Sequence, residues 1–149
     1  MGTDSSNAMS MEVRMSAQTL RVPWEMSSAL HVRRTLVSGL RALEVDATVV
    51  DEAEIVVSEL VSNAVRHAKA LPDGTIRVNW TVSAGVVEVA VTDGGGPTLP
   101  RPARPSIWSA DGRGLRIVRS LAHEWGVEDD GGGRTVWVSL GGPSPHRSQ

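Results

Sequence analysis

The chain has 149 residues, which is enough for one domain of ordinary size with a buried core, so we expect a single domain. Its net charge of −2 and pI near 6.1 give no sign of a basic surface that would bind nucleic acid or a membrane. Cysteine is absent, which excludes disulfides and thiolate metal sites, and no apolar run approaches the roughly 20 residues of a membrane span. We therefore expect a soluble, cytoplasmic protein.

The two ends of the chain differ from its middle. Residues 1–16 are polar and rich in Ser and Met, and the Ser-Asn-Ala before Met9 resembles a cloning remnant, so we expect a disordered segment there. Residues 142–149 are polar as well and are expected to form a disordered tail. The folded domain is therefore predicted to span residues 17–141.

The first elements are a short strand at residues 19–22, which ends at Pro23, and a helix that begins near Ser27 and runs to about Leu43. The apolar positions expected to pack one face of this helix are Leu30, Val32, Leu36, Val37, Leu40 and Leu43. Three arginines, Arg33, Arg34 and Arg41, lie largely off that apolar stripe, as expected for a solvated surface.

The most informative stretch is a predicted helix over residues 54–70, preceded by Asp46, which is suited to cap it. Apolar residues at Val56, Leu60 and Ala64 recur at the spacing of a buried stripe. Glu59 and Asn63 are four apart, so they project from nearly the same face. A carboxylate and a carboxamide beside an apolar stripe are costly to bury unsatisfied, which makes a site plausible although a solvated face has the same pattern.

Two strands follow, because apolar residues alternate with polar ones over residues 76–82 and 87–91 around a turn at Ala84-Gly85. One face of each strand is buried and the other is wetter, so helices should cover a single side of the sheet. Asp93 lies where the second strand ends, in the run Asp-Gly-Gly-Gly-Pro. By itself this run is typical of a turn that terminates a strand.

The rest of the chain contains a loop, a helix and a hairpin. Residues 98–110 hold three prolines and read as a loop. Gly112-Arg113-Gly114 then opens a helix from Leu115 to about Glu124, whose expected core face is Leu115, Val118, Leu121 and Ala122. Free N–H groups and the helix dipole at such a glycine-rich start favour an anion. Residues 125–130 and 134–140 are predicted to form the closing hairpin.

Four segments of the chain, taken together and in order, resemble the boxes of one ATPase superfamily. They are ELVSNAVRHA (59–68), DGGGP (93–97), DGRGLRIV (111–118) and GRTVWVSL (133–140). Their order and spacing resemble the N box, the two glycine boxes and the terminal Thr strand of the GHKL or Bergerat-fold ATPases, and within them the anti-sigma factor serine kinases of actinobacterial type. The resemblance implies an α/β (α+β) two-layer sandwich, with a mixed, mostly antiparallel sheet covered on one face by three helices.

The resemblance also implies roles for individual residues around ATP and Mg²⁺. Asn63 would coordinate Mg²⁺, Glu59 would act as general base, and Asp93 would accept a hydrogen bond from the adenine amino group. The hydroxyl of Thr135 would support Asp93. The other residues implied in nucleotide binding are Arg66, Gly95, Gly112, Arg113, Gly114 and Leu115, of which Gly112, Gly114 and Leu115 would hold phosphates through backbone N–H groups. In the family, residues 98–110 correspond to the lid over the triphosphate, where Arg101 or Arg104 could reach phosphate.

The function implied is an ATP-dependent protein serine kinase that phosphorylates an anti-anti-sigma partner of the STAS type and sequesters a sigma factor. Arg33, Arg34 and Arg41 have an alternative role here, because this end of the anti-sigma kinases provides a partner-binding face. A detached ATP-binding domain of a histidine kinase is a second interpretation, although His31 lacks the surroundings of a phosphoacceptor. A non-catalytic nucleotide-binding module is a third.

One residue departs from the family pattern. The first glycine box would need glycine where this chain has Pro97, and proline fixes φ and lacks an N–H, so the lid hinge should be stiffer and have one donor fewer. Pro97 keeps the binding-only module open. The sequence names neither the protein partners nor the oligomeric state, and a homodimer stays open.

Overall fold

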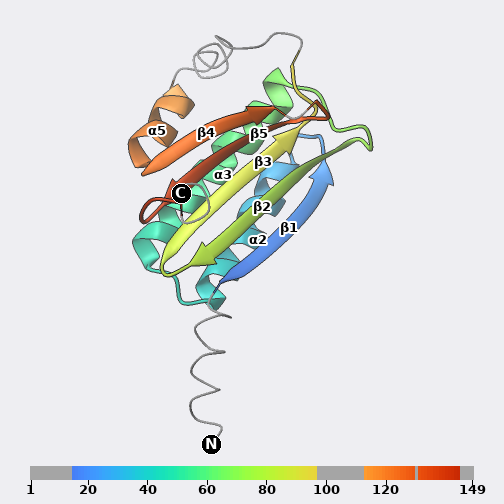
Figure 1. The fold of residues 1–149 in the computed structure, drawn as a ribbon. Coiled ribbons are helices and arrows are strands. Elements are labelled where there is room, and N and C mark those ends of the chain that lie inside the picture. The colour runs from blue at the N-terminus through green and yellow to red at the C-terminus, as the bar shows by residue number, and fades with distance from the viewer. Residues whose placement is uncertain (1–14, 97–112, 130, 145–149) are drawn as a thin grey trace, which may run out of the picture.

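The computed structural model describes residues 15–96, 113–129 and 131–144, without the side chains of residues 113–115. These residues form a layer of helices on one face of a single sheet (Figure 1). In chain order the elements are β1 (Ser16–Pro23), α2 (Ser28–Ala42), α3 (Ala47–His67), β2 (Thr75–Ser83), β3 (Val86–Asp93), α5 (Arg113–Leu121), β4 (Glu124–Asp129) and β5 (Arg134–Leu140).

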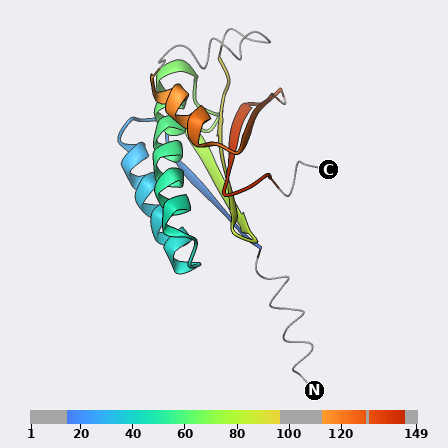
Figure 2. The same cartoon turned by 90° about the vertical axis from the view of Figure 1, so that its left-hand side faces the viewer.

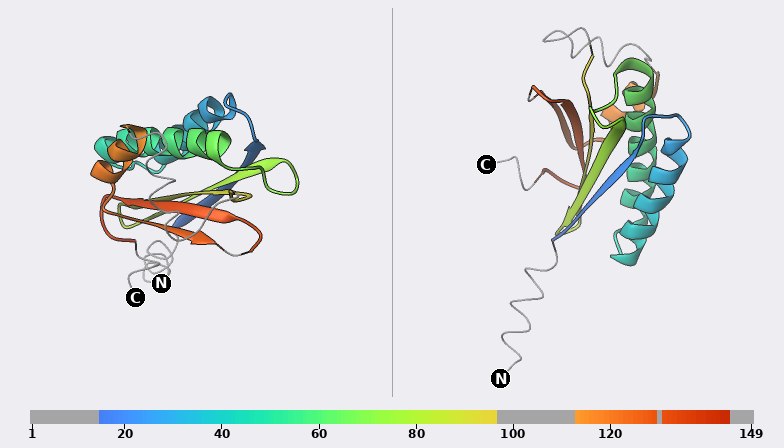
Figure 3. Two further views of the ribbon diagram at one scale, coloured as in Figure 1. Left: turned by 90° about the horizontal axis from the view of Figure 1, so that it is seen from above. Right: turned by 90° about the vertical axis from the view of Figure 1, so that its right-hand side faces the viewer.

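The sheet has five strands in the order β1-β2-β3-β5-β4, and each neighbouring pair is antiparallel. The helices α2, α3 and α5 all lie on the same side of it (Figures 2 and 3). The predicted class, an α+β sandwich with helices on one face, is confirmed. The sheet is antiparallel throughout the described strands, with no parallel pair of the kind a mixed sheet would contain.

The hairpin between β2 and β3 follows from its turn residues. Ala84 and Gly85 have φ values of 53° and 83°, and a two-residue loop with both angles positive matches the right-handed twist of the flanking strands. Along β2 the buried positions alternate strictly with half-buried ones. This alternation places Ile76, Val78 and Trp80 toward the helices, as the period of a strand requires.

Helix α3 is the central helix and is longer than predicted. It begins at Ala47, where Oδ2 of Asp46 accepts a hydrogen bond from the Thr48 N–H at 3.1 Å, and it ends at His67. The N-cap function predicted for Asp46 is therefore confirmed, since this bond satisfies one of the free donors of the first turn.

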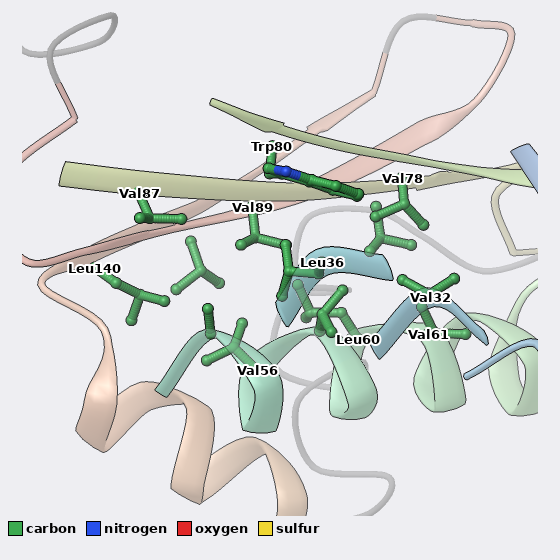
Figure 4. Packing of buried hydrophobic residues seen from close by; sticks show 14 of the residues in the cluster. Val32, Leu36, Val56, Leu60, Val61, Val78, Trp80, Val87, Val89 and Leu140 are labelled. Carbon is green, nitrogen blue, oxygen red and sulfur yellow. The ribbon is translucent and has the colours of Figure 1, made fainter. Parts of the chain in front are cut away.

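The core lies between α2, α3 and the sheet (Figure 4). Side chains of the strands, such as Val87 and Val89, point toward Leu36 of α2 and toward Val56 and Leu60 of α3. Each buried side chain of this size contributes about 1.5–3 kcal/mol relative to an exposed one. This packing holds α3 against β3 and β5.

Three predictions about helix surfaces and ends are wrong. Leu30 and Leu43, expected in the core, are exposed, because the buried stripe of α2 is limited to Val32, Leu36 and Leu40 and the helix ends before Leu43. The last helix ends at Leu121, and Glu124 already belongs to β4. Val118 of that helix does join the core, as predicted.

The folded region extends past the predicted domain end. After β5 the chain turns at Gly141, and the buried Ser144 lies on the sheet face that carries no helix: its Oγ donates to Glu88 and its N–H donates to Glu124 at 2.9 Å. Residues 142–144 are therefore part of the fold, and 145–149 lie outside the described residues. None of the described helices is long and apolar enough to cross a membrane.

Candidate functional site

A cleft of about 370 Å³, its open mouth included, lies between α3 and the adjoining ends of β3 and β5. Its walls are mainly apolar, with a few polar groups, which is the usual make-up of a small-molecule site. The lining residues are Leu60, Asn63, Ala64, His67, Ala68, Val91, Asp93, Arg134 and Val136. Figure 1 shows α3 running behind β3 and β5, so residues far apart in sequence meet here.

Asp93 is the buried acid of the cleft. It is the last residue of β3, its exposed fraction is 5%, and its Oδ1 accepts a hydrogen bond from the Gly95 N–H at 2.7 Å. Burial raises the pKa of Asp93 to about 6, although the Gly95 hydrogen bond and the charge of Arg134 oppose that rise. Among the described residues, Oδ2 of Asp93 has no hydrogen-bond donor.

The backbone after Asp93 is fixed by the segment that follows α3. Gly94 N–H donates to the carbonyl of Lys69 at 2.7 Å, and Lys69 N–H donates to the carbonyl of Gly95 at 3.1 Å. A Cβ at Gly94 would lie 2.1 Å from the carbonyl oxygen of Ala70, so no other residue fits there. Gly95 has a φ of 84°, a conformation that glycine adopts without strain. These contacts hold the Asp93 carboxylate against the end of α3.

Of the site residues predicted on α3, some line the cleft and others do not. Asn63 lines the cleft, as does His67 one turn later. Glu59 is one turn before Asn63 and half-buried, whereas Arg66 is exposed, and neither is among the lining residues. The structure therefore brings Asn63 and Asp93 together in one cleft, with Glu59 beside it on the same helix.

The model of the histidine kinase-like ATPase domain matches residues 23–140, which is most of the chain. The chain belongs to this family. Its fold is similar to the crystal structure of the RsbU and RsbW domains of Rv1364c from Mycobacterium tuberculosis, with a TM-score of 0.64 and 23% identity over 84% of this chain. The chain spans 32% of that longer chain, so the likeness concerns the fold. No match was found among curated proteins.

The segment that resembles the second glycine box reaches the start of α5. Arg113, Gly114 and Leu115 form the first turn of that helix, so their backbone N–H groups are the free donors of a helix start. Gly112, the loop arginines Arg101 and Arg104, and Pro97 lie outside the described residues.

Thr135 does not contact Asp93, contrary to the expectation. In the β3–β5 register Thr135 is the partner of Thr92, and their hydroxyls share a hydrogen bond of 2.7 Å. Thr92 precedes Asp93 on the same strand, and successive side chains of a strand point to opposite faces. Thr135 therefore lies on the sheet face away from the cleft and can support Asp93 only through the neighbouring pair.

Arg134, and not Thr135, lies beside Asp93 in the cleft. It is the register partner of Asp93, 6% exposed, and its Nε donates to Asp129 Oδ1 at 3.0 Å. The sequence carried a signal for this placement, since Val136, Val138 and Leu140 alternate as the core face of β5. Arg134 has the same parity, so it must point toward the helices.

Proposed function

We propose that this ATPase domain binds Mg-ATP in the cleft and acts as a protein serine kinase of the anti-sigma type. Its substrate would be an anti-anti-sigma protein of the STAS type, and a sigma factor would be its second partner. The observation that carries the proposal is a buried carboxylate, Asp93, in an apolar cleft that Asn63 also lines.

The residues that line the cleft offer the groups that an adenine base needs. Leu60, Val91 and Val136 offer apolar surface for a flat ring. Oδ1 of Asp93 is held by Gly95, which leaves Oδ2 to accept from an exocyclic amine. A buried acceptor without a donor costs roughly 1–3 kcal/mol, and a bound amine would remove that cost.

Asn63 and Glu59 supply the groups that phosphoryl transfer needs. The side-chain oxygen of Asn63 is a suitable ligand for Mg²⁺, a hard cation that commonly takes one or two protein groups together with phosphates and water. A magnesium ion bound there would offset the charge of the phosphates. Glu59, one turn away, would accept the proton of the attacking serine hydroxyl. The first turn of α5 would donate backbone N–H groups to phosphate.

The partner proposal rests on the sequence resemblance, on the fold shared with a chain that contains an RsbW domain, and on the surface of α2. A groove between α2 and α3 is lined by Arg33, Arg34, Val37, Ser38, Arg41 and Glu54. Arg33 has an acidic neighbour there, with Nε 3.4 Å from Glu54 Oε2. The resulting basic face suits an acidic protein partner.

A module that binds ATP without transferring phosphate is the second candidate. It is favoured by the position of Glu59, which is half-buried and not among the residues that line the cleft. The two candidates share the binding step and differ in the chemistry after it.

Calorimetry with Mg-ATP tests the binding step that both candidates share. Labelled ATP mixed with candidate partners from neighbouring genes tests the transfer of phosphate. Binding together with phosphate transfer to a partner serine supports the kinase. Binding with no transfer to any partner supports the regulatory module. A protein that binds no nucleotide contradicts both.

A further inference from the structure

Arg134 is a buried cation next to the proposed base-binding acid. It is the first residue of β5, its Cα is paired with that of Asp93 across the β3–β5 ladder, and both side chains line the cleft. Arginine is rarely buried to this extent unless its charge and its donors are satisfied. The groups that satisfy the charge and the N–H donors of Arg134 therefore have to be identified.

One side of the guanidinium is accounted for. Nε donates to Asp129 Oδ1 at 3.0 Å, and Asp129 is its register partner on β4, with an exposed side chain. Arg134 is thus held between acids on two neighbouring strands, with Asp93 on one side and Asp129 on the other. Within the described residues, no hydrogen bond occupies its two Nη groups. The planar fork is oriented by Asp129 and keeps up to four N–H donors.

We infer that Arg134 is a specificity-determining residue that donates a hydrogen bond to a ring nitrogen of the bound base, beside the amine that Asp93 accepts. The inference rests on the proposed function. A carboxylate next to a guanidinium presents an acceptor beside a donor. Adenine presents the complementary pair, since its N6 amine is a donor and the adjacent N1 and N7 are acceptors. Asp129 orients the fork, and the cation also favours the ionised form of Asp93.

A purely structural role makes a different prediction. If Arg134 only links β4 to β5 through Asp129, its replacement lowers the stability of the protein and lowers the affinity for every nucleotide by the same factor. If Arg134 donates a hydrogen bond to the base, the loss of affinity on its replacement depends on whether the base carries that ring nitrogen. Analogues that replace N1 or N7 by carbon separate the two roles, because they leave the triphosphate and the N6 amine unchanged.

The experiment measures dissociation constants for ATP, 1-deaza-ATP and 7-deaza-ATP by calorimetry. The wild type should bind one of the two analogues about tenfold to a hundredfold more weakly than ATP, since a hydrogen bond to a charged donor is lost. The Arg134→Met protein should bind ATP more weakly than the wild type by a similar factor. It should bind ATP and that analogue with equal affinity. Arg134→Lys should recover part of the discrimination, because it keeps the charge without the fork.

Arg77→Met is the matched control. Arg77 lies on β2 between two core residues, so it points to the opposite face of the sheet, and its replacement should leave all three constants unchanged. A wild type that binds both analogues as tightly as ATP overturns the inference, even if Arg134→Met does not fold. An Arg134→Lys or Arg134→Met protein with the full wild-type discrimination also overturns it. A wild type that binds no nucleotide overturns the proposed function, and the inference with it.

Discussion

Strand β3 carries two buried acids that the fold treats in opposite ways. Glu88 and Asp93 are 7% and 5% exposed and lie on opposite faces of the same strand. Glu88 is covered by the chain itself, since the segment after β5 returns and Ser144 Oγ donates to its carboxylate. Asp93 receives one backbone N–H, from Gly95, and otherwise faces a cleft.

The difference separates an acid that holds the fold together from an acid that is available to a ligand. Burial of a carboxylate is costly in both places. At Glu88 the Ser144 hydroxyl donates to the carboxylate. At Asp93 burial raises the pKa to about 6. The raised pKa and the cleft together make Asp93 the better candidate for binding. Four substitutions test this distinction.

The largest effect is expected at a third acid, Glu59. If Glu59 is the general base, Glu59→Gln should lower phosphate transfer to a partner serine by roughly 10²–10⁴-fold and leave the ATP dissociation constant unchanged. Glu52→Gln, two turns earlier on α3, should alter neither quantity. Equal transfer by wild type and Glu59→Gln, measured with labelled ATP, would remove Glu59 from the chemistry.

The second effect is on stability. Because burial raises the pKa of Asp93 above its ordinary value of 3.8, the folded protein binds this proton more tightly than the unfolded chain does. The contribution of Asp93 is most favourable below about pH 3.8 and is lost as pH rises to about 6. Asp93→Asn should therefore increase the free energy of unfolding by up to about 3 kcal/mol at pH 8 without ligand.

This gain should shrink as pH falls from 8 toward 4, which denaturant titrations at several pH values can follow. The exposed Glu44→Gln provides the control and should change stability little at either end of the range. A gain in Asp93→Asn that is constant over this range would show that the carboxylate is not destabilised by burial.

The third effect concerns the other acid. Ser144→Ala removes the Oγ donor to Glu88 and should lower the free energy of unfolding by about 1–3 kcal/mol, since a buried carboxylate loses a donor. ATP affinity should be unchanged, because Ser144 is on the face away from the cleft. The variant Ser38→Ala, exposed on α2, controls for the loss of a hydroxyl. A weaker ATP affinity in Ser144→Ala would mean that the two faces are coupled.

The smallest effect is expected from Asn63→Ala. Removing one oxygen ligand that water can replace should weaken ATP binding by about fivefold, corresponding to roughly 1 kcal/mol, and only when magnesium is present. Titrations with magnesium and with a chelator give the comparison. Equal losses in both conditions would assign Asn63 a structural role.

The sequence predicted the fold well where local chemistry decides the structure. The Asp46 cap, the Ala84-Gly85 turn and the alternation of β2 are each set by a few adjacent residues, and the structure has all three. The pairing of Asn63 with Asp93 in one cleft was predicted through the family resemblance. Spacing along the chain alone could not bring residues of α3 and β3 together.

Other features depend on contacts between distant segments and were missed. Gly94 must be glycine because the carbonyl of Ala70, from the segment after α3, occupies the space of a side chain there. The C-terminal residues looked like a tail because nothing in their composition indicates that Ser144 would meet Glu88. The family motif points to Thr135, whereas the alternation of β5 places Arg134 on the face of the cleft.

The most direct test of the account is calorimetric titration of wild type, Asp93→Asn and Glu88→Gln with Mg-ATP. The two variants remove one negative charge each, from equally buried positions on one strand. We expect Asp93→Asn to weaken binding by about 1–3 kcal/mol and Glu88→Gln to leave the dissociation constant unchanged. Equal affinities for all three proteins, or equal losses in the two variants, would contradict the assignment of Asp93 as the acid that binds the base.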